Sequence, residues 1–230
     1  MMQEMIFRGH KVSYIDVDAN PELGFNFPFQ ILIPEKLNEN PNLIYACNLT
    51  QDYSFKCTTI KELIDLIKTS GNEKYASIDT MMMHLCLDNG NPMIIPFIPR
   101  LGNFRPNFLG RDCLLNNFKL TGADKRFAKE MYMYNDLANQ HKAMVEAAIN
   151  CLRQVGIAVV DKVVLCGYSE GAKFASHLAL LHPEIVKAVV AGGTGGIMSM
   201  PISTYGDYEF IYPTGIADLK DFNFEAFKDI

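Results

Sequence analysis

The stretch that decides the fold lies at residues 163–179 and reads VVLCGYSEGAKFASHLA. It begins with a short apolar run, continues into a G-x-S-x-G motif centred on Ser169, and ends in a helical pattern rich in alanine. The motif glycines, Gly167 and Gly171, suit a strained turn, because a side chain at either position would collide with the neighbouring strand or helix. The pattern predicts a nucleophilic serine at a strand-to-helix turn, and a purely structural glycine-rich turn is the alternative.

Short apolar segments alternate with helical patterns along the rest of the chain, as in a sheet with helices on its faces. Helices are expected from Thr59 to Ser70, from Glu73 to Leu87 and along an apolar stripe from Phe127 to Val155. The later strands are unbroken Val/Ile/Leu runs, which is typical of strands covered on both faces. The sequence therefore predicts one α/β domain, residues 1–230, with a mostly parallel sheet. The expected strands are Lys11 to Ile15, Phe29 to Ile33, Leu43 to Cys47, Met93 to Phe97, Lys162 to Cys166 and Val186 to Ala191.

Composition excludes several classes of protein. Hydrophobic residues make up 49% of the 230 residues, which rules out a disordered chain. The formal charge is −5 and no dense run of Lys or Arg occurs, so a nucleic-acid partner is not expected. No apolar stretch is long enough to cross a membrane and no signal peptide is recognisable, so we expect a cytoplasmic protein without a membrane span. The six cysteines form no C-x-x-C pair and are expected to be reduced and buried, and no cofactor or metal is indicated.

With this motif and this order of elements, the chain resembles the α/β-hydrolase superfamily, and most of all its carboxylesterase- and lipase-type members. The resemblance is sharpest over residues 163–193, which include Gly167-Tyr168-Ser169-Glu170-Gly171 and His182-Pro183-Glu184. As an ordering of elements it covers essentially the whole chain. It implies an α/β-hydrolase fold that forms an acyl-enzyme on Ser169 from a small-molecule carboxylic ester.

The resemblance also implies an oxyanion hole made of two backbone N–H groups. The Glu170 N–H would be one donor, and the second would come from the loop after the third strand, at Leu49 or Thr50. No HGGG-type run is present in that loop. Arg100 and Tyr168 are expected at the rim of the substrate site; Arg100 would bind an anionic substrate group there or form a salt bridge.

Members of the superfamily use a catalytic triad of serine, acid and histidine, in this order along the chain, and the histidine acts as the base. This sequence has no histidine at the corresponding position. Residues 170–230 hold two histidines, His177 and His182, and both come too early. We expect His177 on a solvated helix face and His182 as a cation at the helix end. His141 is expected to be partly buried with its hydrogen bonds satisfied. An acid placed after the sixth strand would be Asp207 or Asp218.

Two functions therefore remain open. In one, the chain is a C-terminally incomplete part of a longer serine esterase and is impaired as it stands. In the other, it is a catalytically inactive, hydrolase-like binding module.

A third hypothesis is phosphate binding at the glycine cluster of residues 192–196. This cluster lacks the lysine of a P-loop, and a flexible loop at the sheet edge is the simpler interpretation. The sequence indicates nothing about oligomeric state.

Overall fold

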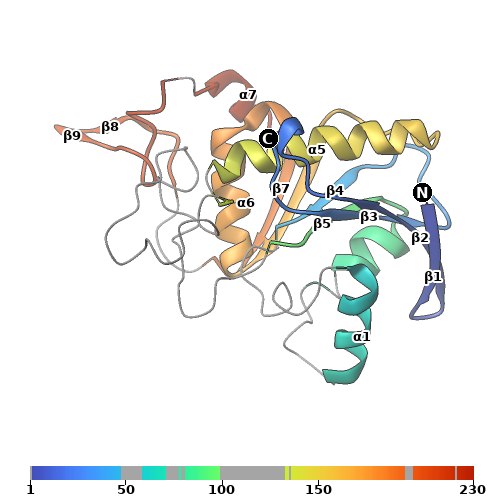
Figure 1. Ribbon diagram of the computed structural model, residues 1–230. Helices are drawn as coiled ribbons and strands as arrows, with labels where there is room; N and C mark the ends of the chain where they lie inside the picture. Colours follow the sequence, from blue (N-terminus) through green and yellow to red (C-terminus); the bar gives the residue numbers. More distant parts are fainter. Residues whose placement is uncertain are drawn as a thin grey trace.

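The computed structural model describes residues 2–47, 59–70, 78, 81–98, 133–134, 136–194, 199–220 and 222–230. Its centre is a seven-stranded sheet with the order β1-β2-β3-β5-β4-β6-β7 (Figure 1). β1, β2, β3 and β5 pair antiparallel in that order, whereas β5, β4, β6 and β7 run parallel. The strands are β1 (Met2–Phe7), β2 (His10–Val17), β3 (Phe29–Pro34), β4 (Leu43–Ala46), β5 (Met93–Pro96), β6 (Val163–Tyr168) and β7 (Val186–Gly192).

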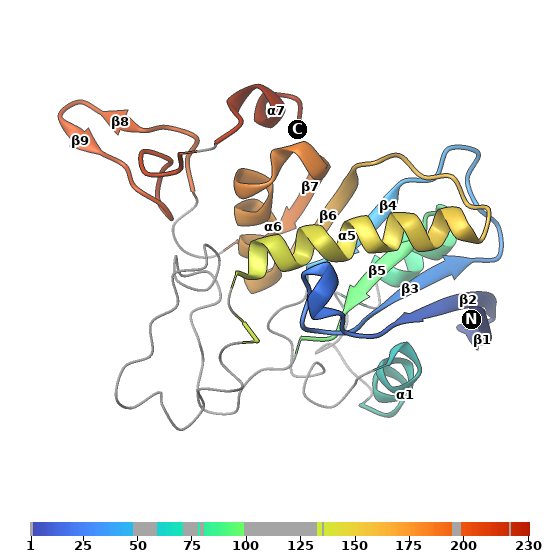
Figure 2. The same cartoon turned by 45° about the horizontal axis from the view of Figure 1, so that its top comes forward.

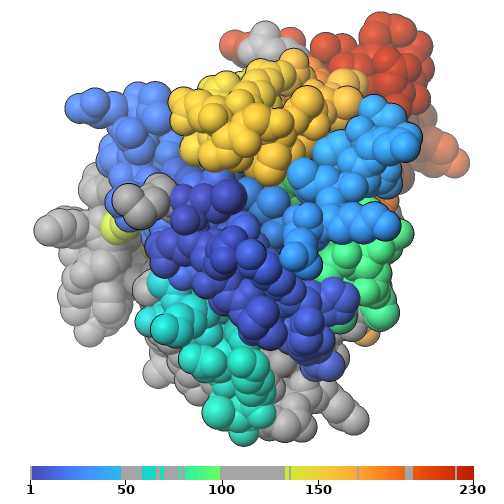
Figure 3. All heavy atoms as spheres, turned by 90° about the vertical axis from the view of Figure 1, so that its right-hand side faces the viewer, coloured from blue at the N-terminus to red at the C-terminus, as the bar shows by residue number. Residues whose placement is uncertain are grey.

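Helices cover both faces of this sheet. On one face, α5 (Leu137–Gln154) and α6 (Glu170–Leu181) pack with the strands into one buried apolar cluster. On the other face, α1 (Ile60–Ser70) and the π-helix η4 (Met81–Asp88) belong to a second cluster. Figure 2 shows α5 lying across the sheet, and Figure 3 shows α5 and α1 on opposite sides of the first strands. The expected fold class, an α/β sheet with helices on both faces, is confirmed, and the sheet is parallel from β5 to β7.

The local sequence explains several element boundaries. α1 begins after Thr59, whose side-chain oxygen accepts a hydrogen bond from the Glu62 N–H at 3.2 Å. The central strands β4 and β5 are buried along their whole length, as their unbroken apolar runs predict. In η4, Met81 and Met82 are buried and contribute to the second apolar cluster. Four cysteines among the described residues are free thiols: Cys47, Cys86, Cys151 and Cys166.

Two strands of the main sheet differ from the sequence-based prediction. The sequence does not predict β1, because Gln3 and Glu4 interrupt its short run of apolar residues; β1 is an exposed edge strand and joins β2 through the tight turn of Arg8 and Gly9, both at positive φ. β7 was expected to be covered on both faces, but it is the other edge of the described sheet and Val190 is 52% exposed. The reason is its position at the end of the strand order, which a pattern of apolar residues does not reveal.

The segment after β7 forms a small unit of its own. A hairpin of β8 (Thr204–Tyr205) and β9 (Tyr208–Glu209) stands away from the main sheet (Figures 1 and 2). Its turn has Gly206 at φ 58°, which suits the first position of a two-residue hairpin turn. The short helix α7 (Phe224–Lys228) follows and packs beside η6 (Pro183–Ile185), the turn between α6 and β7.

The short helix η1 (Pro21–Leu23) follows β2, near the start of the chain. No helix in the described ranges is both long and apolar enough to cross a membrane.

Candidate active site

Ser169 lies at the junction between β6 and α6, with a backbone conformation of φ 57° and ψ −117°. A non-glycine residue at positive φ is strained and persists only where the surroundings enforce it. Here the Ser169 N–H donates to the Gly192 carbonyl at 2.9 Å, and the Ser169 carbonyl accepts from the Ala172 and Lys173 N–H groups. The strand-to-helix turn predicted from the sequence is confirmed, and the serine is exposed to solvent.

The Ser169 hydroxyl is not used to cap its own helix. A serine at the residue before a helix usually accepts a hydrogen bond from an N–H in the first turn. Ser169 occupies this position for α6, but its side chain makes no such bond. The Ser169 side chain therefore leaves the first N–H groups of α6 without a side-chain cap.

The two motif glycines make room for this turn, as expected. A Cβ on Gly167 would lie 2.3 Å from the Gly171 carbonyl carbon and oxygen. A Cβ on Gly171 would lie 2.0 Å from the Cys47 carbonyl oxygen. All these neighbours are backbone atoms, which cannot swing aside as a side chain can. Only glycine at both positions lets β6, α6 and the end of β4 approach so closely.

The candidate oxyanion hole is only partly described. The Glu170 N–H belongs to the first turn of α6, where backbone N–H groups have no partner within the helix and the helix dipole favours negative charge. Leu49 and Thr50 lie outside the described residues, as does Arg100. Cys47, the last described residue before them, donates its N–H to the Cys166 carbonyl at 2.7 Å. β4 therefore ends beside the Ser169 turn, on the edge where the second donor is expected.

Tyr168 borders the site on the side of β7. Its register partner on β7 is Gly192, and its side chain is 56% exposed. A Cβ on Gly193 would lie 2.8 Å from Tyr168 Cε2 and 2.9 Å from Cζ, and one on Gly192 would lie 3.1 Å from Cδ2. One edge of the tyrosine ring thus rests on a glycine backbone. Gly192 and Gly193, read from sequence as part of a flexible loop, support this aromatic side chain, whereas Gly195 and Gly196 lie outside the described residues.

His177 was expected on a solvated helix face, and this expectation is wrong. The side chain is buried on α6, and its Nδ1 lies 2.7 Å from the Tyr212 hydroxyl and 3.2 Å from Ser199 Oγ. Burial lowers the pKa of His177 to about 4, with nearby Lys173 adding to the effect. The physical reason is a tertiary contact, since residues 199–220 pack over the face that the helical pattern left open to solvent.

His141 is more buried than expected, and only one of its two ring nitrogens has a hydrogen-bond partner among the described residues. It belongs to α5, and its Nδ1 forms a hydrogen bond with the hydroxyl of Tyr45 on β4, while its ring packs against Phe174 of α6 at 4.4 Å between centroids. Nε2 is buried without a partner in the described part of the chain. Burial lowers the pKa of His141 to about 3, and His182 contributes in the same direction. The imidazole is therefore neutral in the folded protein.

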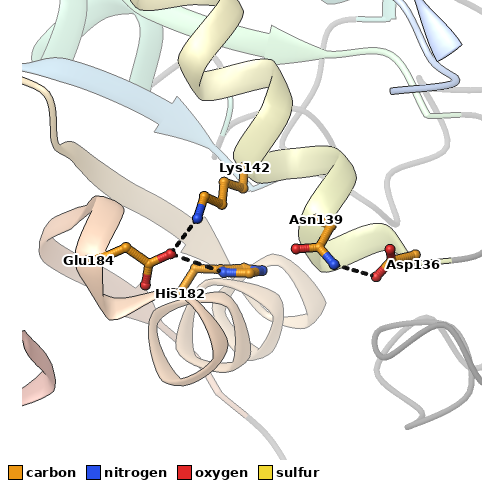
Figure 4. Close-up of polar contacts among 5 residues, drawn as sticks. All are labelled: Asp136, Asn139, Lys142, His182 and Glu184. Atoms are coloured by element: carbon orange, nitrogen blue, oxygen red, sulfur yellow. Dashed lines mark hydrogen bonds and ion pairs between the residues drawn. The ribbon is translucent and has the colours of Figure 1, made fainter. Parts of the chain in front are cut away.

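His182 ends α6, as the sequence indicates, and forms a polar cluster with the neighbouring helix (Figure 4). Its Nδ1 lies 3.3 Å from Glu184 Oε1, which also accepts from Lys142 Nζ at 2.8 Å. Burial lowers the pKa of His182, although Glu184 opposes this shift. The expected cation at the helix end is therefore disfavoured. In the same view, Asp136 accepts a hydrogen bond from Asn139 at the start of α5.

The imidazoles of His84, His141, His177 and His182 thus form hydrogen bonds with groups other than Ser169. Among the contacts of the described residues, no imidazole forms a hydrogen bond with the Ser169 hydroxyl. Of the two candidate acids, Asp218 accepts the Tyr212 N–H at 2.7 Å, and Asp207 lies in the β8–β9 turn. The described residues hold no cluster of three or more potential metal ligands. The geometry therefore supplies a strained, exposed serine without a described base.

No protein-family model and no curated protein matches this chain. Among solved structures it is similar to an acetyl xylan esterase from Aspergillus awamori, with 21% identity and a TM-score of 0.43 over 80% of this chain and 53% of that one. It is also similar to an S-formylglutathione hydrolase from Agrobacterium tumefaciens, with 17% identity, a TM-score of 0.45, and coverage of 86% and 62%. A ferulic acid esterase from the anaerobic fungus Anaeromyces mucronatus follows, with 10% identity, a TM-score of 0.35, and coverage of 87% and 63%.

These similar structures are esterases and hydrolases, as the sequence resemblance led us to expect. This chain spans between about half and two thirds of their length. What each of them acts on is a property of that protein.

Proposed function

We propose that the chain is a serine hydrolase of the esterase type, with an α/β-hydrolase fold and Ser169 as its nucleophile. The observation that carries the proposal is the backbone of Ser169, held at φ 57° between glycines that have backbone atoms against them. Strain of this kind is retained where function requires it. A structural turn would need neither a serine at this position nor a hydroxyl that leaves the helix uncapped.

The reaction follows from the placement of these groups. Ser169 Oγ attacks the carbonyl carbon of a small carboxylic ester, the C–O bond to the alcohol breaks, and an acyl-enzyme forms. The negative charge on the carbonyl oxygen is stabilised by the Glu170 N–H and the dipole of α6, with Leu49 or Thr50 as the second donor. Water then attacks the acyl-enzyme and releases the acid, and Ser169 is restored.

We infer that this reaction is slow in the 230-residue chain. Attack by a serine requires a base to remove its proton, and the imidazoles of His141, His177 and His182 form hydrogen bonds with other groups. The Ser169 proton therefore passes to solvent, and solvent protonates the departing alkoxide to give the alcohol. A serine site without its base typically keeps only about 10³- to 10⁴-fold acceleration over water, from the oxyanion hole and binding.

Hydrolysis of p-nitrophenyl acetate tests the proposal. The purified chain should hydrolyse the ester slowly, and Ser169→Ala should reduce the rate to that of buffer alone. Ser176→Ala is the matched control, because Ser176 lies on the same helix and its hydroxyl bonds only to the Ala172 carbonyl. Equal rates for the wild type and Ser169→Ala would show that Ser169 is not the nucleophile.

The pH dependence of this rate tests the inferred impairment separately. Without an imidazole base, the rate should rise with hydroxide concentration and show no plateau near neutral pH. A plateau with a midpoint near the pKa of about 6.5 of a free imidazole would show that a histidine does assist Ser169.

A catalytically inactive, hydrolase-like binding module is the second candidate. The engagement of His141, His177 and His182 in contacts elsewhere favours it directly. Such a module would bind an ester without forming a covalent adduct. This alternative would be supported over the hydrolase by saturable binding of an ester that stays intact, with Ser169 unmodified after prolonged incubation with that ester.

A further inference from the structure

Tyr168 directly precedes the proposed nucleophile in the chain, and glycine backbone supports one edge of its ring. Its ring edge, from Cδ2 to the hydroxyl, lies over the backbone of Gly192 and Gly193. Gly193 has φ +62°, a conformation that residues with a side chain rarely adopt. Glycine is therefore needed here both for its backbone conformation and because a Cβ would collide with the ring. More than half of the Tyr168 surface, 56%, is exposed to solvent.

This support ties the ring to the turn that carries Ser169. The Ser169 N–H donates to the Gly192 carbonyl, so the residue that supports the ring also anchors the nucleophile. Tyr168 and Gly192 are register partners on adjacent parallel strands, at the carboxyl edge where ligands collect in open α/β sheets. The aromatic surface and the reactive oxygen thus belong to one small unit.

We propose that Tyr168 determines substrate choice at this site by favouring esters that carry a flat ring next to the ester group; this rests on the function proposed above. A substrate ring would contact the open surface of the tyrosine while Ser169 reaches the ester carbonyl. Because the glycine backbone already restricts the tyrosine, little side-chain freedom is lost on binding. Contacts between aromatic rings favour the bound state beyond the area they bury.

The experiment compares two fluorophosphonates that differ in one substituent, 2-phenylethyl or n-octyl, which have equal numbers of carbon atoms. The measured quantity is the ratio of their second-order rates of modification at Ser169. The ratio should favour 2-phenylethyl in the wild type and fall by about 2- to 12-fold in Tyr168→Ala, as expected for the loss of one aromatic contact. Tyr168→Phe keeps the ring and should keep the ratio.

A second variant tests the role of the glycine support. In Gly193→Ala the new Cβ would displace the ring, so the ratio should fall although Tyr168 is unchanged. Melting temperatures should be compared, because a general loss of structure would slow both reagents equally and leave their ratio unaltered.

The outcomes separate the two proposals. If Ser169 reacts but Tyr168→Ala and the wild type show the same ratio, the role of Tyr168 is refuted and the proposed function stands. If neither reagent modifies Ser169 in the wild type, the proposed function fails, and the role of Tyr168 fails with it.

Discussion

Replacing Gly171 by alanine should destabilise the protein strongly, although the same change inside a helix normally stabilises by about 1 kcal/mol. Gly171 lies in the first turn of α6, and its new Cβ would lie 2.0 Å from the Cys47 carbonyl oxygen. The contact becomes tolerable only beyond 3.0 Å, so α6 and the end of β4 must separate by about 1 Å. Overpacking of this kind typically costs about 1–3 kcal/mol. We expect the upper end, because the atom in the way is backbone.

Thermal denaturation followed by circular dichroism measures this effect. A loss of about 3 kcal/mol corresponds to a fall in melting temperature of roughly 6–12 °C for a chain of this size. Gly156→Ala is the control: its φ is +81° but no atom lies within 4 Å of the new Cβ, so only backbone strain of about 1–2 kcal/mol is expected. If Gly171→Ala melted at or above the temperature of Gly156→Ala, the close approach of β4 and α6 would be wrong.

Three further changes test other parts of the structure. Tyr212→Phe removes the hydroxyl that bonds to His177, which should cost about 1–3 kcal/mol in urea unfolding; Tyr208→Phe, at a 76% exposed tyrosine, should cost nothing. Burial lowers the pKa values of His141 and His177 to about 3 and about 4, so the unfolded chain binds more protons between those values and about 6.5. The free energy of unfolding should therefore be highest above pH 6.5 and fall by roughly 1.4 kcal/mol per pH unit for each histidine below that pH. Equal urea midpoints at pH 7 and pH 5 would contradict this. Thr59→Ala removes the cap of α1 and should cost about 1 kcal/mol by the same assay, whereas an unchanged midpoint would show that the cap is not needed.

The turn around Ser169 was predictable because its signals are local. An apolar run gives β6, glycines on both sides of the serine mark a strained turn, and small residues such as Ala172 let α6 lie close to the sheet. Each of these depends on residues within one stretch of the chain. The alternation of apolar segments and helical patterns predicted the layers of the fold in the same way.

Features that depend on distant residues were not predictable. His177 shares a helix face with polar residues, and its burial comes from Tyr212, which is 35 positions away. The support of Tyr168 by Gly193 comes from the neighbouring strand, so the glycine cluster suggested only a flexible loop. β1 was not predictable because Gln3 and Glu4 interrupt its short apolar run, and its place in the sheet depends on pairing with β2.

The most direct test of the central claim is the site at which the protein reacts with a fluorophosphonate, determined by mass spectrometry of the intact protein and of its peptides. We predict one adduct per chain, located on Ser169, formed slowly, and absent from Ser169→Ala but present in Ser176→Ala. An unmodified Ser169 after prolonged incubation, or an adduct spread over several serines, would contradict the claim that this strained turn carries a nucleophile.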